Sequence, residues 1–353
     1  MNLQTLLQQC VECKASDVHL SAGEPARLRI DGDLVRVSDE LLSHDDIYTS
    51  LVGIMSSAHI QHFSQQKACD FAYEAPGISR FRVNVFQQAR GVAAVFRAIA
   101  QRVPDLDALQ APKILEQLVR SARGLVLVTG PTGSGKSTTI AAMIDRLNQT
   151  APKHILTIED PVEFVHQPAR CLINQREVGS HTLSFANALS EGLREDPDVI
   201  FIGEMRDLDT IRLALTAAET GHLVFATLHT PGAPKSIDRI IDVFPAAEKE
   251  MVRSMLSESL NAVISQVLCQ RKEGVGRVAA YEIMVATPAI RHLIREGKVA
   301  QMYSVIQTGS ACGMQTLDQS LSALVAQGAI DPRQASEKAK MPDSQMFQKT
   351  IAT

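Results

Sequence analysis

The chain has 353 residues, of which 45% are hydrophobic and 21% charged, and its formal net charge is −4. This length predicts two domains and this composition is typical of globular proteins. There is no run of 18 apolar residues, no signal-peptide pattern at the N-terminus and no dense Lys/Arg run. We therefore expect a cytoplasmic protein with reduced cysteines, no transmembrane helix and no nucleic-acid partner.

Residues 1–98 predict a small α/β domain. A helix over residues 3–13 precedes short alternating strands, DVHL, RLRI and LVRV, and the Asp-Gly at 31–32 indicates a hairpin turn. The longer strand RFRVNVF alternates strictly, which places Arg80, Arg82 and Asn84 on one face. By spacing alone, this is best interpreted as a solvated arginine face on a half-buried sheet.

Residues 99–112 predict a linker, and residues 113–353 a second domain. In the second domain, continuous apolar runs alternate with helical patterns, which is typical of a parallel sheet covered on both faces. From about residue 246 onward we predict a mostly helical tail. The four apolar runs are LVLVT (125–129), HILTI (154–158), VIFI (199–202) and LVFATL (223–228).

The first of these runs leads into GPTGSGKST at residues 130–138, and a helical pattern follows. This is the GxxxxGK[ST] phosphate loop in its required context of strand, loop and helix. Its backbone N–H groups and the helix N-terminus are suited to bind phosphates, Lys136 to reach the β and γ phosphates, and Ser137 to hold Mg²⁺. The sequence therefore predicts an ATP and Mg²⁺ site. The nucleotide-binding residues are Gly130, Thr132, Gly133, Ser134, Gly135, Lys136, Ser137 and Thr138.

Polar residues follow the other three runs, and the carboxyl ends of parallel strands meet at one edge of a sheet. Glu204 follows VIFI, where it could hold Mg²⁺ through water, and Glu163 follows HILTI, where it could activate the attacking water. The residues alone leave open whether these two roles are exchanged. His229 follows LVFATL and is placed to sense the γ-phosphate.

His222 lies seven residues before His229. On one strand, an odd separation points the two side chains to opposite faces, and seven residues span roughly 23 Å. A shared metal is therefore excluded. We expect His222 to have a structural or intersubunit role.

The segments GPTGSGKST, TIEDPVEF, DVIFIGEMRD and TGHLVFATLHT resemble the Walker A, Asp box, Walker B and His box of the type II/IV secretion ATPases. The resemblance covers nearly the whole chain. It implies a PAS-like N-terminal domain, a RecA-like ATPase domain with C-terminal helices, and a homohexameric ring with ATP between the two domains of a subunit. It also implies nucleotide contacts for Arg82 and Arg97, with Arg80 as a further candidate, and a link between His222 and domain closure.

Within this family, the chain resembles the ATPases that drive type IV pilus retraction and twitching motility. That likeness implies a motor at the cytoplasmic side of the inner membrane, with a membrane platform protein and a second retraction ATPase as partners. Three alternatives are disfavoured. Pilus-extension ATPases typically have a four-cysteine zinc motif, a RecA-like DNA motor would be more basic, and a non-hydrolysing protein would not need Lys136, Glu163 and Glu204 together.

The segment AIRHLIRE at residues 289–296 resembles a motif that the family ties to retraction, with His292 where Asn is usual. Thr287-Pro288 predicts a helix start, and Ile290, Leu293 and Ile294 form an apolar stripe. We expect Arg291 and Arg295 to face outward, either merely solvated or able to meet an acidic partner, with little contribution to stability.

Overall fold

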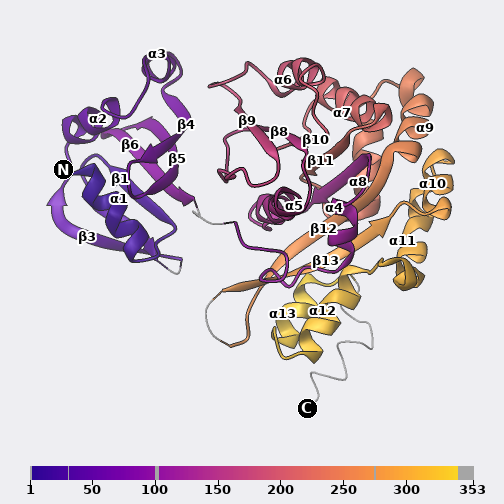
Figure 1. Cartoon of the computed structure of the whole chain (residues 1–353). Coiled ribbons are helices and arrows are strands. Elements are labelled where there is room, and N and C mark those ends of the chain that lie inside the picture. Colours follow the sequence, from indigo (N-terminus) through magenta and orange to yellow (C-terminus); the bar gives the residue numbers. More distant parts are fainter. Residues whose placement is uncertain (1, 31, 100–102, 274–275, 341–353) are drawn as a thin grey trace. The chain divides into compact units, whose positions relative to one another are not determined.

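The computed structural model describes residues 2–30, 32–99, 103–273 and 276–340 (Figure 1). Residues 100–102 of the predicted linker and 341–353 of the predicted second domain lie outside the described residues. The chain divides into two compact units. The first comprises Met1–Arg102 and Pro161–Val165, and the second Val103–Asp160 and His166–Thr353. Among the described residues, no helix has the length and apolar character needed to cross a bilayer.

The first unit is built on an antiparallel sheet of six strands in the order β3-β2-β1-β6-β5-β4. The strands are β1 (Asp17–Ser21), β2 (Pro25–Ile30), β3 (Asp33–Leu41), β4 (Ala68–Ala75), β5 (Ser79–Gln88) and β6 (Gly91–Ile99). The helices are α1 (Leu3–Glu12), α2 (His44–Val52) and α3 (Ser57–Gln66). Asp31, in the predicted hairpin turn, lies outside the described residues, but Ile30 and Asp33 pair across that turn as expected.

One face of this sheet is buried and the other is polar. Phe81 and Val83 on β5 are buried in the same apolar cluster as Leu7 of α1 and Ile47 of α2, whereas Arg82 between them is only half-buried. The predicted alternation of RFRVNVF is confirmed. It presents the arginines on the face that this cluster leaves open.

The second unit contains a sheet of seven strands in the order β13-β12-β7-β11-β10-β8-β9, and only β13 is antiparallel to its neighbour. The four predicted strands are confirmed. The strands are β7 (Gly124–Thr129), β8 (His154–Glu159), β9 (Leu172–Glu177), β10 (Val199–Ile202), β11 (Leu223–Leu228), β12 (Leu260–Gln270) and β13 (Arg277–Val285).

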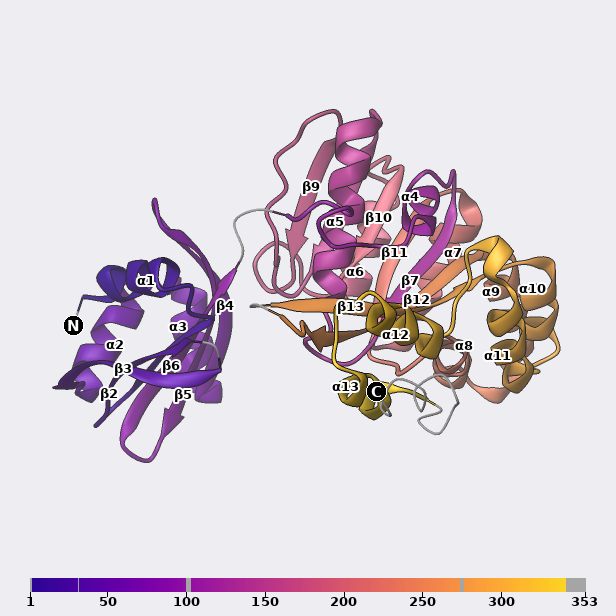
Figure 2. The same cartoon turned by 90° about the horizontal axis from the view of Figure 1, so that it is seen from below.

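Helices cover both faces of this sheet, as continuous apolar strands require. Leu125 and Leu127 of β7 belong to one apolar core, with helices α6 to α11, while Val126 and Val128 belong to the other, with α4 and α5. Figure 2 shows α9, α10 and α11 beside one another. The helices are α4 (Ile114–Val119), α5 (Lys136–Thr150), α6 (Phe185–Gly192), α7 (Leu208–Thr220), α8 (Ala233–Asp242), α9 (Lys249–Ser259), α10 (Pro288–Arg295), α11 (Val299–Thr308), α12 (Leu317–Ala326) and α13 (Pro332–Lys338).

The prediction of a mostly helical tail from residue 246 missed two long strands, β12 and β13. Helix α9 passes into β12 at Leu260 without a Gly or Pro to mark the change. Because β12 is buried on both faces, its apolar run has no alternation, and periodicity cannot distinguish such a run from a buried helix. β12 pairs with β7 and so lies directly beside the strand that leads into the phosphate loop.

Candidate active site

The phosphate loop connects the end of β7 at Thr129 to the start of α5 at Lys136. Gly130, Gly133 and Gly135 have φ values of 140°, 76° and 85°, which side-chain-bearing residues rarely adopt. The Lys136 ammonium is buried and donates to the carbonyl oxygens of Gly130 and Pro131, at 2.9 and 3.0 Å. Ser137 and Thr138 lie in the first turn of α5. This curled loop at a helix N-terminus fits phosphate binding.

Gln266 of β12 supports the loop from beneath, and the sequence analysis missed it. Its Nε2 donates to the Ser134 carbonyl at 2.6 Å, and a Cβ on Gly130 would collide with the Gln266 carbonyl oxygen. Three buried polar atoms here have no hydrogen-bond partner among the described residues: Thr129 Oγ1, Ser134 Oγ and Gln266 Oε1. Gln266 was not predicted because it lies on β12, and hydrophobic periodicity does not reveal that strand.

His229 connects the phosphate loop to the acidic end of β10. Its Nδ1 is 3.4 Å from Lys136 Nζ and 3.5 Å from Thr132 Oγ1, and its Nε2 is 3.2 Å from Glu204 Oε1. An ammonium can only donate, so these contacts fit a neutral imidazole that accepts at Nδ1 and carries its proton on Nε2. β11 lies between β7 and β10, and this strand order brings the three residues together.

Glu204 is held in its charged form. Arg206 Nη2 lies 2.6 Å from Glu204 Oε2. Burial by itself raises the pKa of Glu204, but the hydrogen bonds from Arg206 and His229 and the charge of Arg206 outweigh that effect and lower the pKa below its ordinary value. An ionised carboxylate beside the phosphate loop fits the predicted Mg²⁺ role. Arg206 itself was not predicted.

Two further carboxylates, which the sequence analysis did not assign, are buried at the same edge of the sheet. Glu159 ends β8 and Glu177 ends β9, and they face each other across this pair of strands. Glu159 Oε1 accepts hydrogen bonds from Thr157 at 2.8 Å and Gln175 at 3.3 Å. Carboxylate oxygens are ligands that Mg²⁺ prefers, so these two residues add to the oxygen-rich character of this edge.

Glu163, the predicted water-activating residue, falls within Pro161–Val165, the segment that belongs to the first unit. The chain leaves the second unit after Asp160 and returns to it at His166. The role of Glu163 stays a prediction.

On the first unit, Arg82 of β5 lies directly opposite Arg97 of β6. Like charges in this position repel each other, so the pair costs stability unless an anion neutralises it. Arg97 Nε donates to Asp17 Oδ1 at 2.9 Å, and the Asp17 side chain is only 5% exposed whereas that of Arg97 is 67% exposed. Asp17 therefore orients Arg97, whose side chain remains exposed to solvent.

His222 has a local structural contact. Its Nδ1 lies 3.0 Å from the carbonyl oxygen of Ala217, near the end of α7, and its own carbonyl accepts from the N–H of Gly124. Together these contacts tie the end of α7 to the starts of β11 and β7. The structural hypothesis for His222 thus has an observed basis, whereas the link to closure stays a prediction.

The segment AIRHLIRE forms α10, with Thr287 as N-cap, Pro288 at the first position and a buried stripe of Ile290, Leu293 and Ile294, as predicted. The expectation for its arginines needs correction. Arg291 Nη1 donates to the carbonyls of Ser257 and Glu258 at the end of α9, and Arg295 Nη1 lies 3.1 Å from Glu258 Oε1. Cations are favoured at a helix C-terminus, so both arginines stabilise α9 within the chain.

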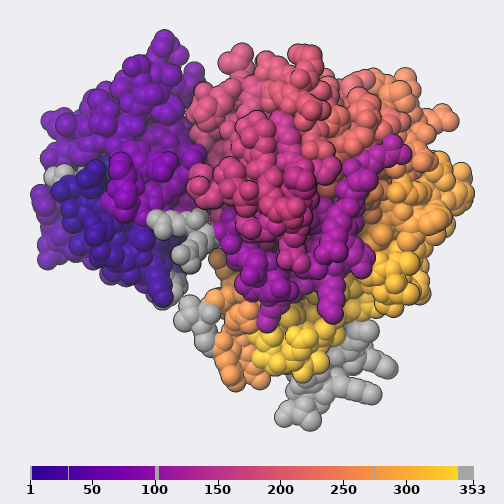
Figure 3. Space-filling model, in the orientation of Figure 1, coloured from indigo at the N-terminus to yellow at the C-terminus, as the bar shows by residue number. Residues whose placement is uncertain are grey.

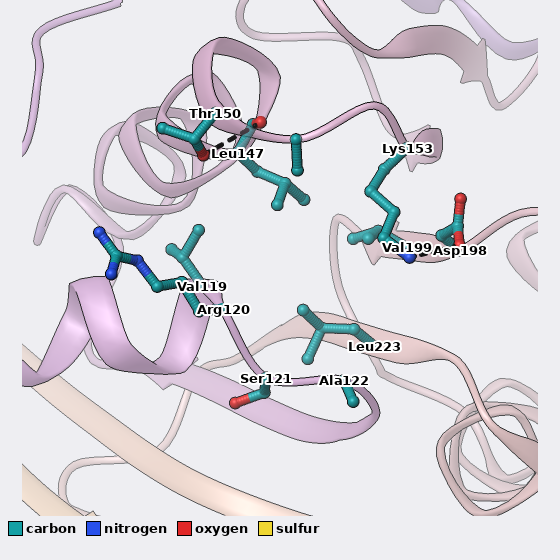
Figure 4. Close-up of a pocket in the computed structure, with 11 residues that line it drawn as sticks. Val119, Arg120, Ser121, Ala122, Leu147, Thr150, Lys153, Asp198, Val199 and Leu223 are labelled. Atoms are coloured by element: carbon teal, nitrogen blue, oxygen red, sulfur yellow. Dashed lines mark hydrogen bonds and ion pairs between the residues drawn. The ribbon is translucent and has the colours of Figure 1, made fainter.

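A separate hollow of about 430 Å³ lies at the opposite edge of the second sheet (Figure 4). Val199 and Leu223, the first residues of β10 and β11, line it. Arg120 and Lys153 stand on opposite sides, and Lys153 is paired with Asp198 at 2.7 Å. It is distinct from the edge that carries Lys136 and His229.

The phosphate loop, the acidic strand end and the bridging histidine define a P-loop ATPase. The family model described as "Type II/IV secretion system protein" matches residues 1–337, and the chain belongs to this family. It is 58% identical over 344 residues to the "Type IV pilus retractation ATPase PilT" of Pseudomonas aeruginosa, covering 98% of this chain and 100% of that one. It is 58% identical over 320 residues to a "Twitching motility protein" of Neisseria gonorrhoeae, covering 91% and 86%.

A solved structure, "Crystal Structure of the Pilus Retraction Motor PilT and Bound ADP", superposes with a TM-score of 0.89 at 46% identity, covering 96% of this chain and 97% of that one. The predicted family and the predicted ATPase activity are confirmed. The predicted function, pilus retraction in twitching motility, agrees with the names of these relatives.

Proposed function

We propose that this chain hydrolyses ATP to drive type IV pilus retraction in twitching motility. The observation that carries the proposal is the position of His229, which contacts the phosphate-loop lysine through one ring nitrogen and the strand-end carboxylate through the other. This arrangement links the γ-phosphate position to the residue that would hold the metal. The likeness to retraction ATPases over nearly the whole chain supports the mechanical role.

The phosphates would lie in the curl of residues 130–135, against the N-terminus of α5. Loop N–H groups and Lys136 would neutralise their charge, and the glycines leave the backbone open to them. Mg²⁺, when bound, would offset charge between the β and γ phosphates. The Ser137 hydroxyl and, through water, the ionised Glu204 would hold it.

The attacking water needs an acceptor for its proton, and we assign this role to Glu163. His229 would detect the γ-phosphate through the contacts it now makes with Lys136 and Glu204. Arg82 and Arg97, presented on an open sheet face, would neutralise the phosphate charge that develops during transfer. Glu163, Arg82 and Arg97 belong to the first unit, and the phosphate loop and His229 belong to the second.

We further infer a PAS-like first unit, a RecA-like second unit and a homohexameric ring at the cytoplasmic side of the inner membrane. The antiparallel sheet with helices on one face and the largely parallel sheet with helices on both faces support these fold types. A membrane platform protein would receive the mechanical output, and a second retraction ATPase would act beside the ring.

The test combines purified protein with cells. The wild-type chain should hydrolyse ATP in a Mg²⁺-dependent manner, and it should restore twitching when expressed in a strain whose retraction ATPase has been deleted. Hydrolysis without restored retraction would refute the mechanical role and leave the ATPase assignment intact. Restoration by a hydrolysis-defective His229→Ala variant would refute the assigned mechanism.

A further inference from the structure

The loop that carries His229 is anchored at its far end by Glu282 of β13. Only 1% of Glu282 is exposed, and its Oε1 accepts a hydrogen bond at 2.7 Å from the N–H of Ala233, the first residue of α8. Its Oε2 forms an ion pair with Lys340 Nζ at 2.6 Å. One buried carboxylate thus joins the start of α8 to a lysine just beyond α13.

The Glu282 carboxylate is compensated by opposite charge on two sides. A carboxylate at a helix N-terminus is stabilised by the helix dipole and by a free backbone N–H group. A buried carboxylate without a counter-charge is strongly unfavourable, and Lys340 supplies that counter-charge. Lys340 is itself fixed, because its backbone N–H donates to Asp318 at 2.8 Å and its ammonium lies 5.5 Å from the centre of the Tyr303 ring.

The residues between His229 and Ala233 have little freedom. The hydroxyls of Thr230 and Ser236 lie 2.6 Å apart, and Ser236 also donates to the carbonyl of Gly232 at 2.9 Å. Gly232 has φ of 122°, and a Cβ there would lie 2.7 Å from Lys340 Nζ. The loop is therefore packed directly against the ion pair, and a side chain at position 232 would have to displace Lys340.

We propose that Glu282 and Lys340 act as a positioning pair that holds His229 in contact with Lys136 and Glu204. This inference rests on the proposed role of His229 in ATP hydrolysis. In Figure 3 the surface of the C-terminal helices is continuous with the rest of the second unit. The inference gives these helices a role in ATP hydrolysis, because Lys340 follows α13. Neither residue touches the phosphate loop, so both act through the His229 loop.

The first experiment replaces Lys340 by Met in the full chain, with Lys338→Met as the matched control. Lys338 is exposed at the end of α13 and is outside this network. Lys340→Met leaves Glu282 without its counter-charge, so the anchor of the loop weakens. We expect kcat for ATP to fall about tenfold while KM stays within about twofold, because the phosphate loop is untouched. Equal kcat in the two variants overturns the inference.

The second experiment separates positioning from general destabilisation. In a His229→Ala background, Lys340→Met should cause no further loss of kcat, because residues that act as a unit are not additive. The double variant Glu282→Gln/Lys340→Met should recover most of the lost kcat, since Gln keeps an oxygen for the Ala233 N–H and needs no counter-charge. An equal loss in both backgrounds, or no recovery, overturns the inference. A wild-type chain without ATP hydrolysis would instead refute the proposed function.

Discussion

The two sheets of this chain present their polar side chains in different ways. The antiparallel sheet of the first unit buries one face and leaves arginines on the other, so Arg82 and Arg97 meet side by side on a face. The parallel strands of the second unit are buried on both faces, so Lys136, Glu204 and His229 meet at an edge. The site at the edge is already connected by hydrogen bonds. On the face, Asp17 pairs with Arg97, while Arg82 has no ion pair with any described residue.

The largest loss of ATP turnover is expected from a substitution in the phosphate loop, at the edge of the second sheet. Lys136→Ala should lower ATP turnover by about a thousandfold, because the phosphates lose their lysine. Lys153→Ala is the matched control, since that lysine lies at the opposite edge of the same sheet and is paired with Asp198. Turnover and circular dichroism are measured for both variants. If Lys136→Ala keeps most of its turnover, the phosphate-loop assignment is wrong.

The acidic residues should separate into two roles. Glu163→Gln should retain ATP binding but lose about a hundredfold in turnover, since an amide cannot accept the proton of water. Glu204→Gln should instead raise the Mg²⁺ concentration needed for half-maximal turnover. Nucleotide affinity and turnover are measured over a Mg²⁺ series. The reverse pattern would show that the two roles are exchanged.

Substitutions of Arg82 and Arg97 test whether the polar face of the first sheet takes part in hydrolysis, as the edge of the second sheet does. Arg82→Ala should lower turnover about tenfold without loss of thermal stability, because its side chain forms no ion pair with any described residue. Arg97→Ala should lower both turnover and thermal stability, because the buried Asp17 would lose its counter-charge. Arg36→Ala on β3 is the control for an exposed arginine of the same sheet. Normal turnover in both variants would favour the solvated-face interpretation.

Gln266→Leu should have a moderate effect confined to binding. It removes the hydrogen bond to the Ser134 carbonyl, which is worth about 1 kcal/mol, so KM for ATP should rise about fivefold. Because Gln266 lies beneath the loop and not at the transferred phosphate, kcat should change less than KM. A selective loss of kcat would contradict the supporting role.

The smallest effect on hydrolysis is expected at α10. Replacing Arg291 and Arg295 by Ala should lower the free energy of unfolding by about 1–2 kcal/mol, since the end of α9 loses its cationic cap. Hydrolysis should remain near normal while pilus retraction in cells is impaired. Unchanged retraction would leave α9 capping as the whole role of these arginines, and a parallel loss of hydrolysis would show that the helix supports the active site.

The sequence was sufficient for features that depend on local order. The phosphate loop, the four apolar strands with polar ends, and the alternation of β5 are all encoded within a few residues. It was insufficient for contacts between distant segments. Gln266 and Glu282 lie on strands whose apolar runs show no distinctive period, and Lys340 meets Glu282 only through the tertiary fold. The contacts of Arg291 with α9 were missed for the same reason.

The tight connection from β11 to α8 has a mechanical consequence. Thr230 and Gly232 are hydrogen-bonded to Ser236 of α8, so we expect a displacement of His229 at the nucleotide to be transmitted to α8. Ile237 of α8 shares one apolar core with Ile306 of α11 and Ile290 of α10. This continuous packing gives a route along which force generated at the phosphate could reach the outer helices.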